Sequence, residues 1–344
     1  MNTMRAAMYY SNEDVRIEEI PIPEINDNEL LVRVQACGIC GSDVMELYRL
    51  KTAPRVLGHE MTGDIVKVGK NVTTFSKGQR VFVSHHVPCN TCRYCLNDHH
   101  TLCETLHSTN FYPGGFAEYL RVPPINVDRG VFVLPDDLSY AEGTFIEPLA
   151  CVVRGMRIAR MAPTKSILII GSGVAGLLHI KLAHAMGAGR IFAVDITKAR
   201  LEKAKHVGAH KVFQATDDVT KALKTYNDGR LADLVVVAAG VPSAVLQGIK
   251  AVQPSGTLLL FAPPKPKVEV PLDLFEIWNK QIDIVSTYAG APRDILESIE
   301  LIRSKQVEVT DMITHTLPLE KAQQGFSLVA QAEDSMKVII EPQK

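Results

Sequence analysis

Four closely spaced cysteines constrain the fold of this chain more than any other feature. Cys89, Cys92, Cys95 and Cys103 stand in the pattern Cys-x2-Cys-x2-Cys-x7-Cys, among turn-forming residues. Thiolates at this spacing can converge on one tetrahedral zinc ion, with Zn–S distances of roughly 2.3 Å. Disulfides are the alternative, but they need an oxidising compartment, and the N-terminus shows no signal peptide. The pattern therefore predicts a closed, structural zinc site.

Length and composition narrow the class of protein. A chain of 344 residues is too long for one hydrophobic core and predicts two domains. Hydrophobic residues make up 46%, charged residues 22%, and the net charge is −1. This near-neutral balance argues against a nucleic acid or an anionic membrane as partner, and no apolar run reaches the roughly 18 residues that span a bilayer. Seven cysteines, an odd number, favour metal ligation in a reducing cytoplasm.

The N-terminal part of the chain is typical of a β-rich domain. Short runs of apolar and β-branched residues, separated by proline, glycine and asparagine, predict strands. These are Met4–Tyr10, Val15–Ile20, Glu29–Val34, Gly63–Val68, Phe116–Val122 and Val131–Leu134. Because no helices alternate with them, we expect a small antiparallel barrel or roll.

The pattern changes after about residue 136. Tyr140–Ala159 has helical spacing, and from Ser166 onward strands and helices alternate, which predicts a parallel, doubly wound sheet. The expected strands are Ser166–Ile170, Arg190–Val194, Leu234–Ala238, Thr257–Phe261 and Ile282–Val285, with helices at Val174–Met186 and Thr197–Val207. The last fifty or so residues, with helices at 292–304 and 319–330 and strands near 313 and at 336–340, are expected to return to the first domain.

A glycine-rich loop predicts a dinucleotide site. Gly171, Gly173 and Gly176 follow the apolar strand SILII and open a helix with Val174 and Ala175. The glycines allow a tight turn, close approach of the backbone to a pyrophosphate, and close helix–strand packing. The free N–H groups at the start of the helix, together with its dipole, favour the anion.

Asp195 ends the next predicted strand, at about the 20-residue spacing expected for an acid that binds the adenosine ribose. A carboxylate accepts hydrogen bonds from the ribose hydroxyls and repels a 2′-phosphate, so NAD is predicted over NADP. Asp195 could instead be only a helix cap. Lys198 and Arg200 follow; Arg200 is a candidate cofactor contact, although charges at the start of a helix are more often solvated.

A second cluster of possible metal ligands combines Cys40, His59 and Glu60, with Glu147 farther along the chain. Catalytic zinc typically takes three protein ligands and keeps one position open. A zinc ion there would lower the pKa of a bound alcohol, and an alkoxide readily gives hydride to a nicotinamide. A redox pair of Cys37 with Cys40 is the alternative, but it lacks the βαβ context of such motifs. Cys151 has no partner at metal spacing and is interpreted as a small core residue.

Together, the motifs CGICGSD, GHE, GGFAEY, FIEPLA and GSGVAG and the four-cysteine segment resemble the zinc-dependent medium-chain dehydrogenase/reductase family. The resemblance is strongest to its sorbitol, threonine and galactitol-phosphate dehydrogenase branch and runs nearly end to end. It implies an α/β fold with a GroES-like, β-rich catalytic domain at residues 1–155 and 291–344, carrying the zinc lobe at about 86–108. A Rossmann NAD-binding domain would occupy residues 156–290. The resemblance also implies a dimer or tetramer joined through Rossmann strands.

The resemblance assigns roles in the catalytic site. It makes Cys40, rather than Cys37, the zinc thiolate and His59 the imidazole ligand. Glu60 is a ligand or a nearby acid, and Glu147 can reach the metal or its water. It also implies that Asp43 orients His59 through the other ring nitrogen, and that Ser42 contacts the substrate oxygen and passes on its proton.

One position departs from the family pattern. Members often carry a histidine five residues after the ligand cysteine, where it relays the proton outward, and this chain has Met45 there. The relay would then run through water or through another group such as His85 or His86, or would be slower. The sequence leaves these routes open.

The sequence therefore predicts a cytoplasmic, homo-oligomeric enzyme with two zinc ions per chain, one catalytic and one structural. It would transfer a hydride between NAD and a secondary alcohol or polyol, or reduce the corresponding ketone. Amino-alcohol oxidation of the L-threonine 3-dehydrogenase type is the alternative within the family. From other classes, a nucleic-acid-binding protein would need a basic surface, and a non-catalytic zinc protein would be expected to have lost Cys40 or His59.

Overall fold

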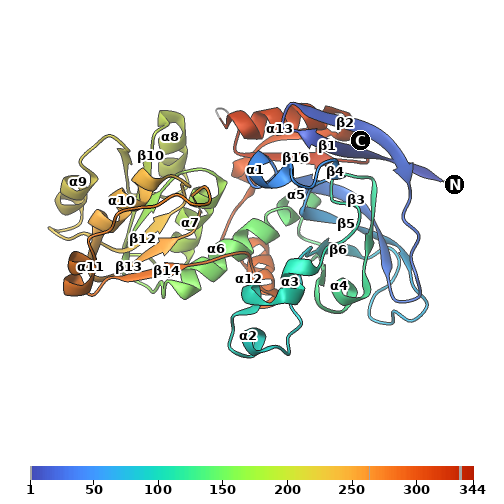
Figure 1. Cartoon of the computed structure of the whole chain (residues 1–344), viewed down its shortest axis with the longest axis horizontal. Coiled ribbons are helices and arrows are strands. Elements are labelled where there is room, and N and C mark those ends of the chain that lie inside the picture. Colours follow the sequence, from blue (N-terminus) through green and yellow to red (C-terminus); the bar gives the residue numbers. More distant parts are fainter. Residues whose placement is uncertain (1, 263, 333–334) are drawn as a thin grey trace. The chain divides into compact units, whose positions relative to one another are not determined.

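The computed structural model describes residues 2–262, 264–332 and 335–344. It divides the chain into two units, one formed by residues 1–150 with 291–344 and the other by residues 151–290 (Figure 1). The chain thus leaves the first unit, builds the second and returns. Within the described residues, no helix has both the length and the apolar character needed to cross a bilayer.

Two β-sheets form the first unit. Its strands are β1 (Thr3–Ser11), β2 (Asp14–Pro21), β3 (Leu30–Gly38), β4 (Arg55–Val56), β5 (Glu60–Val68), β6 (Arg80–Val83), β7 (Tyr119–Val122), β8 (Val131–Val133), β15 (Ile313–Pro318) and β16 (Lys337–Glu341). One sheet has the order β2-β1-β4, and the other runs β15-β16-β3-β5-β6-β8, with β7 also paired to β3. The C-terminal strand β16 therefore lies directly beside β3.

Short helices surround these sheets. They are α1 (Glu46–Arg49), α2 (Arg93–Leu96), α3 (Glu104–Ser108), α4 (Pro124–Arg129), α5 (Tyr140–Gly143), α12 (Pro292–Arg303) and α13 (Ala322–Gln331). The helical stretch expected at 140–159 is divided into α5 and α6 (Ile146–Ile158). The break follows a capping box in which the Glu142 N–H donates to Ser139 Oγ and the Ser139 N–H donates to the Glu142 carboxylate. The division between the two units falls inside α6.

Aromatic packing joins the two ends of the chain within the first unit. The Phe326 ring, on α13, lies 5.5 Å from the ring centroid of Tyr9 on β1 and 5.5 Å from that of Phe116. All three side chains are fully buried. Rings at this separation add to the hydrophobic gain from burial. The C-terminal helix is therefore part of the core of the first unit.

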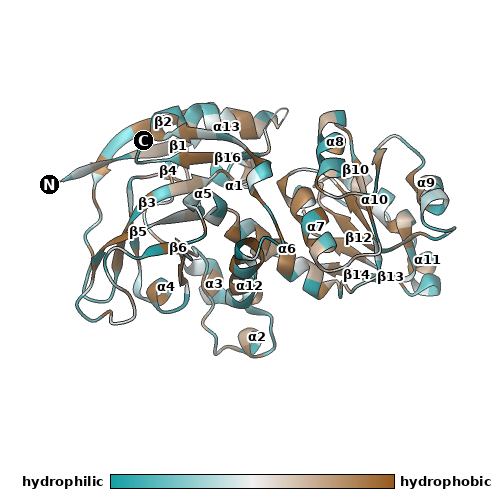
Figure 2. Cartoon of the chain, turned by 180° about the vertical axis from the view of Figure 1, so that it is seen from behind, coloured by the Kyte–Doolittle hydropathy of each residue, from teal (hydrophilic) through white to brown (hydrophobic). Residues whose placement is uncertain are grey.

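The second unit is a six-stranded parallel sheet with helices. Its strands are β9 (Ser166–Ile170), β10 (Arg190–Asp195), β11 (Lys211–Gln214), β12 (Ala232–Val237), β13 (Val252–Leu260) and β14 (Asp283–Ser286), in the order β11-β10-β9-β12-β13-β14. Its helices are α7 (Val174–Ala185), α8 (Lys198–His206), α9 (Val219–Tyr226), α10 (Pro242–Ala251) and α11 (Leu274–Lys280). The central strand β12 is apolar except for Asp233, and it is mostly brown, the hydrophobic colour, in Figure 2, as expected for a sheet covered on both faces. This is the doubly wound order 3-2-1-4-5-6 of a Rossmann fold, and the predicted fold class is confirmed.

The packing of α13 gives a first prediction. Replacing Phe326 by alanine is expected to destabilise the first unit by about 3–5 kcal/mol, because a buried ring leaves a cavity between two other rings. Urea unfolding followed by circular dichroism measures the change. Leu296→Ala, at an exposed position on α12 in the same unit, is the control and should shift the midpoint little. Equal midpoints for the two variants would contradict the role given to α13.

Candidate functional site

A pairing between two strands brings three candidate ligands together. In the antiparallel ladder of β3 and β5, Gly38 lies opposite Glu60. Cys40 follows β3 by two residues, and His59 immediately precedes β5. The thiol of Cys40, a ring nitrogen of His59 and a carboxylate oxygen of Glu60 all lie within 4.8 Å of one another. Thiolate, imidazole and carboxylate form a donor set suited to zinc.

Asp43 connects two of these residues. Its Oδ2 accepts a hydrogen bond from the Cys40 N–H at 3.0 Å, and its Oδ1 lies 3.4 Å from Nδ1 of His59. Burial alone would raise the pKa of Asp43, but His59 and Arg49 lower it below its usual value. Burial likewise opposes a charge on His59, yet Asp43 and Cys40 raise its pKa well above the ordinary value. These surroundings thus favour positive charge at the position of His59. Because Nδ1 of His59 contacts Asp43, Nε2 is the ring nitrogen left for a metal.

Glu60 carries a second contact that the sequence did not predict. Its Oε2 forms an ion pair with Nζ of Lys337, and both side chains are almost completely buried. The same ammonium lies 4.9 Å from the ring centroid of Phe145. A Cβ at Gly38 would come within 2.4 Å of that Glu60 oxygen, so the pair depends on a glycine there. Only one oxygen of Glu60 contacts Lys337 in this arrangement, which leaves the other for a metal.

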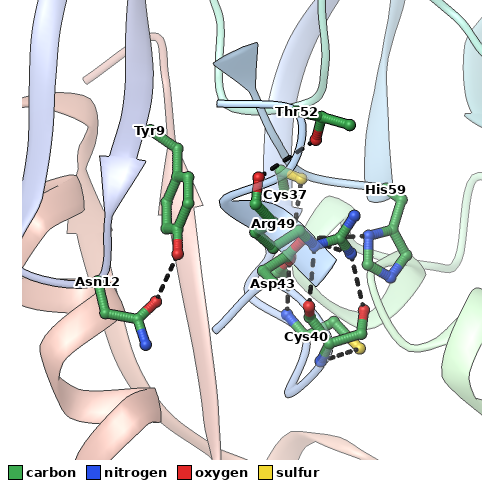
Figure 3. Close-up of polar contacts among 10 residues, drawn as sticks. Tyr9, Asn12, Cys37, Cys40, Asp43, Arg49, Thr52 and His59 are labelled. Carbon is green, nitrogen blue, oxygen red and sulfur yellow. Dashed lines mark hydrogen bonds and ion pairs between the residues drawn. The ribbon is translucent and has the colours of Figure 1, made fainter. Parts of the chain in front are cut away.

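Arg49 lies beside Cys40, Asp43 and His59 (Figure 3) and contacts Ser42. The Arg49 guanidinium donates from Nε to the Ser42 carbonyl oxygen at 2.9 Å and from Nη2 to Ser42 Oγ at 3.1 Å. Nη2 also lies 3.5 Å from Oδ1 of Asp43. The two residues expected to assist catalysis, Ser42 and Asp43, are therefore held by one arginine.

Other candidate residues are not members of this group. Cys37 is completely buried, burial raises the pKa of its thiol well above the usual value, and its sulfur packs against Gly58 and Gly115. Glu147 lies partly exposed in the first turn of α6, and its carboxylate does not join the three-residue group. Cys151 is half-buried on the same helix. The structure thus brings Cys40, His59 and Glu60 together without Cys37 or Glu147.

The rings of His85 and His86 lie in succession beside that of His59. The ring centroid of His85 lies 4.9 Å from that of His59 and 3.8 Å from that of His86. The Asn126 side chain holds this segment by donating to the carbonyl oxygens of Ser84 and His85. Burial lowers the pKa of His85 well below the ordinary value and that of His86 to about 4. Both imidazoles are therefore neutral near pH 7.

The four-cysteine segment forms a separate cluster. The sulfurs of Cys89, Cys92, Cys95 and Cys103 all lie within 4.8 Å of one another. Cys92 Sγ is 3.5 Å and Cys89 Sγ is 4.0 Å from Cys95 Sγ. Tetrahedral ligation at Zn–S distances of roughly 2.3 Å places sulfurs roughly 3.8 Å apart, so the arrangement fits zinc. None of the seven cysteines, all of which lie in the described part of the chain, forms a disulfide.

Backbone amides favour thiolates in this segment. Cys89 Sγ accepts hydrogen bonds from the N–H groups of Thr91 and Cys92 at 3.4 and 3.2 Å. The hydrogen bonds from Thr91, followed by that from Cys92, lower the pKa of the Cys89 thiol to about 5. Arg129 on α4 donates to the carbonyl oxygen of Cys89 at 2.7 Å and attaches the lobe to the unit.

The glycine-rich loop joins β9 to α7 as predicted. Gly171 has φ +101°, a conformation that side chains rarely adopt. A Cβ at Gly176 would lie 1.9 Å from the carbonyl oxygen of Gly171, whereas one at Gly173 would meet nothing within 4 Å. Val174 and Ala175 form the first helical positions of α7. The open space at Gly173 and the N–H groups in the first turn of α7 suit the approach of a pyrophosphate.

Asp195 is part of the same loop structure. It is nearly buried at the end of β10, and its two oxygens accept hydrogen bonds from the N–H groups of Ser172, at 2.7 Å, and Thr197, at 2.8 Å. Each carboxylate oxygen keeps a lone pair for a further donor. Arg200 lies partly exposed on α8. Ile196, 81% exposed, is an apolar residue beside Asp195 that the sequence reasoning did not identify.

Sequence reasoning also missed Arg49 and Lys337. Arg49 lies on the short helix α1, which has no extended helical pattern to mark it. Lys337 stands at the start of an apolar run, and a lysine there is normally interpreted as solvated. Its only sequence signal is that it directly precedes the three apolar residues Val338–Ile340, which are all buried.

Two family models match the chain. The alcohol dehydrogenase GroES-like domain matches residues 26–136, and the zinc-binding dehydrogenase model matches residues 174–304. The first range includes the Cys40 cluster and the four-cysteine lobe. The second range begins at Val174, the first residue of α7.

Individual relatives extend the match over nearly the whole chain. Sorbitol dehydrogenase of Bacillus subtilis is 31% identical over 351 residues, covering 99% of this chain and 98% of that protein. L-threonine 3-dehydrogenase of Bacillus velezensis is 34% identical over 339 residues, covering 94% of each. The crystal structure of galactitol-1-phosphate dehydrogenase from Escherichia coli superposes with a TM-score of 0.88 at 27% identity, covering 98% of this chain and 100% of that one. The resemblance in the sequence motifs is thus confirmed, and the chain belongs to the zinc-dependent medium-chain dehydrogenase/reductase family of oxidoreductases.

Proposed function

We propose that this protein is an NAD-dependent, zinc-containing dehydrogenase that oxidises a secondary alcohol of a polyol and, in reverse, reduces the ketone. The observation that carries the proposal is the group of Cys40, His59 and Glu60 at the β3–β5 pairing, with Ser42 beside it. The similarity to a sorbitol dehydrogenase over nearly the full length supports the substrate class. Family membership in turn disfavours the nucleic-acid-binding and non-catalytic alternatives.

Cys40, His59 and Glu60 would hold the catalytic zinc, and Cys89, Cys92, Cys95 and Cys103 the structural one. The catalytic ion supplies a Lewis acid that makes an alcohol more acidic. Lys337 balances the charge of Glu60 and leaves one carboxylate oxygen free to face the ion. Glu147, outside the group, remains a candidate for a ligand or a contact to water.

Two neighbouring residues would serve the proton and the metal ligand. The Ser42 hydroxyl would contact the substrate oxygen and accept its proton. Asp43, through its 3.4 Å contact with Nδ1, would keep the His59 ring oriented. His85 and His86 are neutral acceptors near this site, and the route of the proton beyond Ser42 stays open between them and water.

The second unit would bind NAD. The amides around Gly171, Gly173 and Gly176, with Val174 and Ala175 at the helix start, would receive the pyrophosphate. Asp195 would accept hydrogen bonds from the adenosine ribose, and its charge would disfavour a 2′-phosphate. Arg200 would approach the same end of the cofactor. NAD supplies the hydride acceptor.

Oxidation of an amino alcohol is the second candidate. It is favoured by the 34% identity to an L-threonine 3-dehydrogenase over nearly the whole chain. That substrate carries an ammonium and a carboxylate, each of which needs a partner in the site. The metal ligands alone do not separate the two candidates, because both reactions remove a hydride from a secondary carbinol.

We also propose that the protein is a cytoplasmic homo-oligomer, a dimer or a tetramer. Strand β14 ends the parallel sheet and has only β13 beside it among the described strands. Nearby, the side chains of Leu274, Phe275 and Trp278 on α11 are 67–74% exposed. An apolar surface of this kind suits a second copy. The thiol clusters fit a reducing compartment.

A substrate screen tests the proposed function. Purified protein is expected to reduce NAD in the presence of a polyol and to show little turnover with threonine. The screen compares polyols, simple secondary alcohols and threonine, each with NAD and with NADP. Turnover of threonine alone would favour the second candidate, and a zinc-loaded protein with no turnover on any of these substrates would refute the proposal.

A pair of cysteine variants tests the two zinc sites. The protein is expected to contain about two zinc ions per chain. Cys40→Ser should lose about one of them and all turnover while keeping its melting temperature, since Cys40 lies on a loop beside an intact ladder. Cys95→Ser should also lose about one zinc ion but should melt at a lower temperature, because structural zinc contributes folding energy. The opposite pattern in metal analysis and thermal unfolding would mean that the two roles are exchanged.

A conservative variant tests the role of Asp195. Asp195→Asn keeps one oxygen acceptor for the loop amides but removes the negative charge. We expect KM for NAD to rise about tenfold or more, because a hydrogen bond to a charged group is lost, and the preference for NAD over NADP to narrow. Asp217→Asn is the matched control, since Asp217 accepts the Gln214 N–H at the end of the neighbouring strand β11. An unchanged preference in Asp195→Asn would overturn the assignment.

A further inference from the structure

Resting on the proposed function, we propose that Arg49 is a positioning residue for Ser42, which fixes the direction of the serine hydroxyl in a chain that has methionine at position 45. No part of the family pattern used above assigns a role to this arginine. The inference starts from the three contacts of its guanidinium with Ser42 and Asp43.

The chemistry of the contact determines what Ser42 can do. A guanidinium has five N–H donors and no acceptor, so Ser42 Oγ must accept the hydrogen bond from Nη2 at 3.1 Å. One lone pair of the serine oxygen is thereby used. Its second lone pair remains to take the substrate proton, and its own O–H remains to pass a proton to the next acceptor. Arg49 thus fixes a hydroxyl that would otherwise rotate.

The same contact excludes Arg49 as the relay itself. A residue with no acceptor cannot take a proton from Ser42, so Arg49 does not replace a histidine chemically. It supplies a fixed positive charge beside Ser42 Oγ, which favours passage of the serine's own proton to the next acceptor as Oγ takes the proton of the substrate. Preorganised charge of this kind favours the anionic form of a neighbouring oxygen without reorganisation during the reaction.

Arg49 is itself held rigidly. Its backbone lies at the end of α1, where the Thr52 hydroxyl donates to the Arg49 carbonyl oxygen at 3.3 Å. At the other end of this helix, Asn12 donates from its side chain to the Val44 carbonyl oxygen and from its backbone to the Glu46 carboxylate. Figure 3 shows Asn12 bonded to Tyr9 and, separately, Arg49 among Cys40, Asp43 and His59. Such support is what a positioning residue requires.

The contact between Arg49 and Asp43 is shielded from solvent. The Asp43 side chain is 1% exposed and that of Arg49 is 23% exposed. In this environment a charge-assisted hydrogen bond is stronger than on an open surface. Arg49 also bonds to the Ser42 carbonyl oxygen through Nε, so the guanidinium is fixed by two bonds to one residue.

A double-mutant cycle tests the proposal in the full-length, zinc-loaded protein. Arg49→Met is expected to lower kcat about 10²-fold, the scale of loss for a misplaced reacting group, with KM for the alcohol and the zinc content nearly unchanged. Arg49→Lys should recover part of kcat, since one ammonium can replace only part of the fork. In a Ser42→Ala background, Arg49→Met should cost little more, because the group it positions is already gone.

Controls separate the possible outcomes. Lys51→Met removes an exposed positive charge two residues farther along and should leave kcat unchanged. Additive losses in the double mutant, or loss of zinc together with activity in Arg49→Met, would overturn the proposal and would assign Arg49 to the Asp43–His59 framework instead. An unchanged kcat in Arg49→Met would also overturn it. These results concern Arg49 alone, because failure of the proposed function would already appear as absent turnover in the wild-type protein.

Discussion

The antiparallel pairing of β3 with β5 is the constraint on which the catalytic site depends. It places Gly38 opposite Glu60, so that the loop carrying Cys40 and the turn carrying His59 leave the same end of one ladder. On its other side β3 pairs with β16, where Ile339 lies opposite Gly38, and this brings Lys337 to the carboxylate of Glu60. The missing side chain at Gly38 gives the ion pair its space. Backbone hydrogen bonds thus define the positions of groups that lie far apart in the sequence.

Charge balance explains why this arrangement suits a divalent cation. An unpaired carboxylate in the interior is costly, and each of the two buried carboxylates has a basic partner. Glu60 is paired with Lys337, and Asp43 contacts Arg49 and His59. The thiol of Cys40 accepts the Ser42 N–H at 3.4 Å and interacts with His59, whose Nδ1 already contacts Asp43. A metal ion would supply the charge that a thiolate at this position requires.

The sequence predicted what depends on local pattern and short spacing. The strands around Ile169 and Val194, the glycine-rich loop and the four-cysteine cluster follow from apolar periodicity or from residues a few positions apart. The two-residue strand β4 and the one-turn helix α1 could not be predicted, because neither contains a full structural period. The pair of Glu60 with Lys337 could not be predicted either, since it depends on β16 pairing beside β3. Arg49 was missed for a different reason: it lies only seven residues after Ser42, but the one-turn helix α1 that brings its guanidinium back to Ser42 has no pattern in the sequence.

Hydrophobic burial is too small to order the four-cysteine lobe by itself. Its buried core consists of Cys95, Cys103 and Leu106, with Cys89 and Cys92 packed against them. One leucine and four small sulfur-bearing side chains bury too little apolar surface to offset the entropy of ordering more than a dozen residues, at about 1–2 kcal/mol for each backbone. Arg129 attaches only one end of the segment to the unit. The remaining stabilisation must come from elsewhere, and convergent thiolates at tetrahedral separations would provide it by binding a metal. Ligation would then order the lobe in a way that the two sheet-based cores do not need.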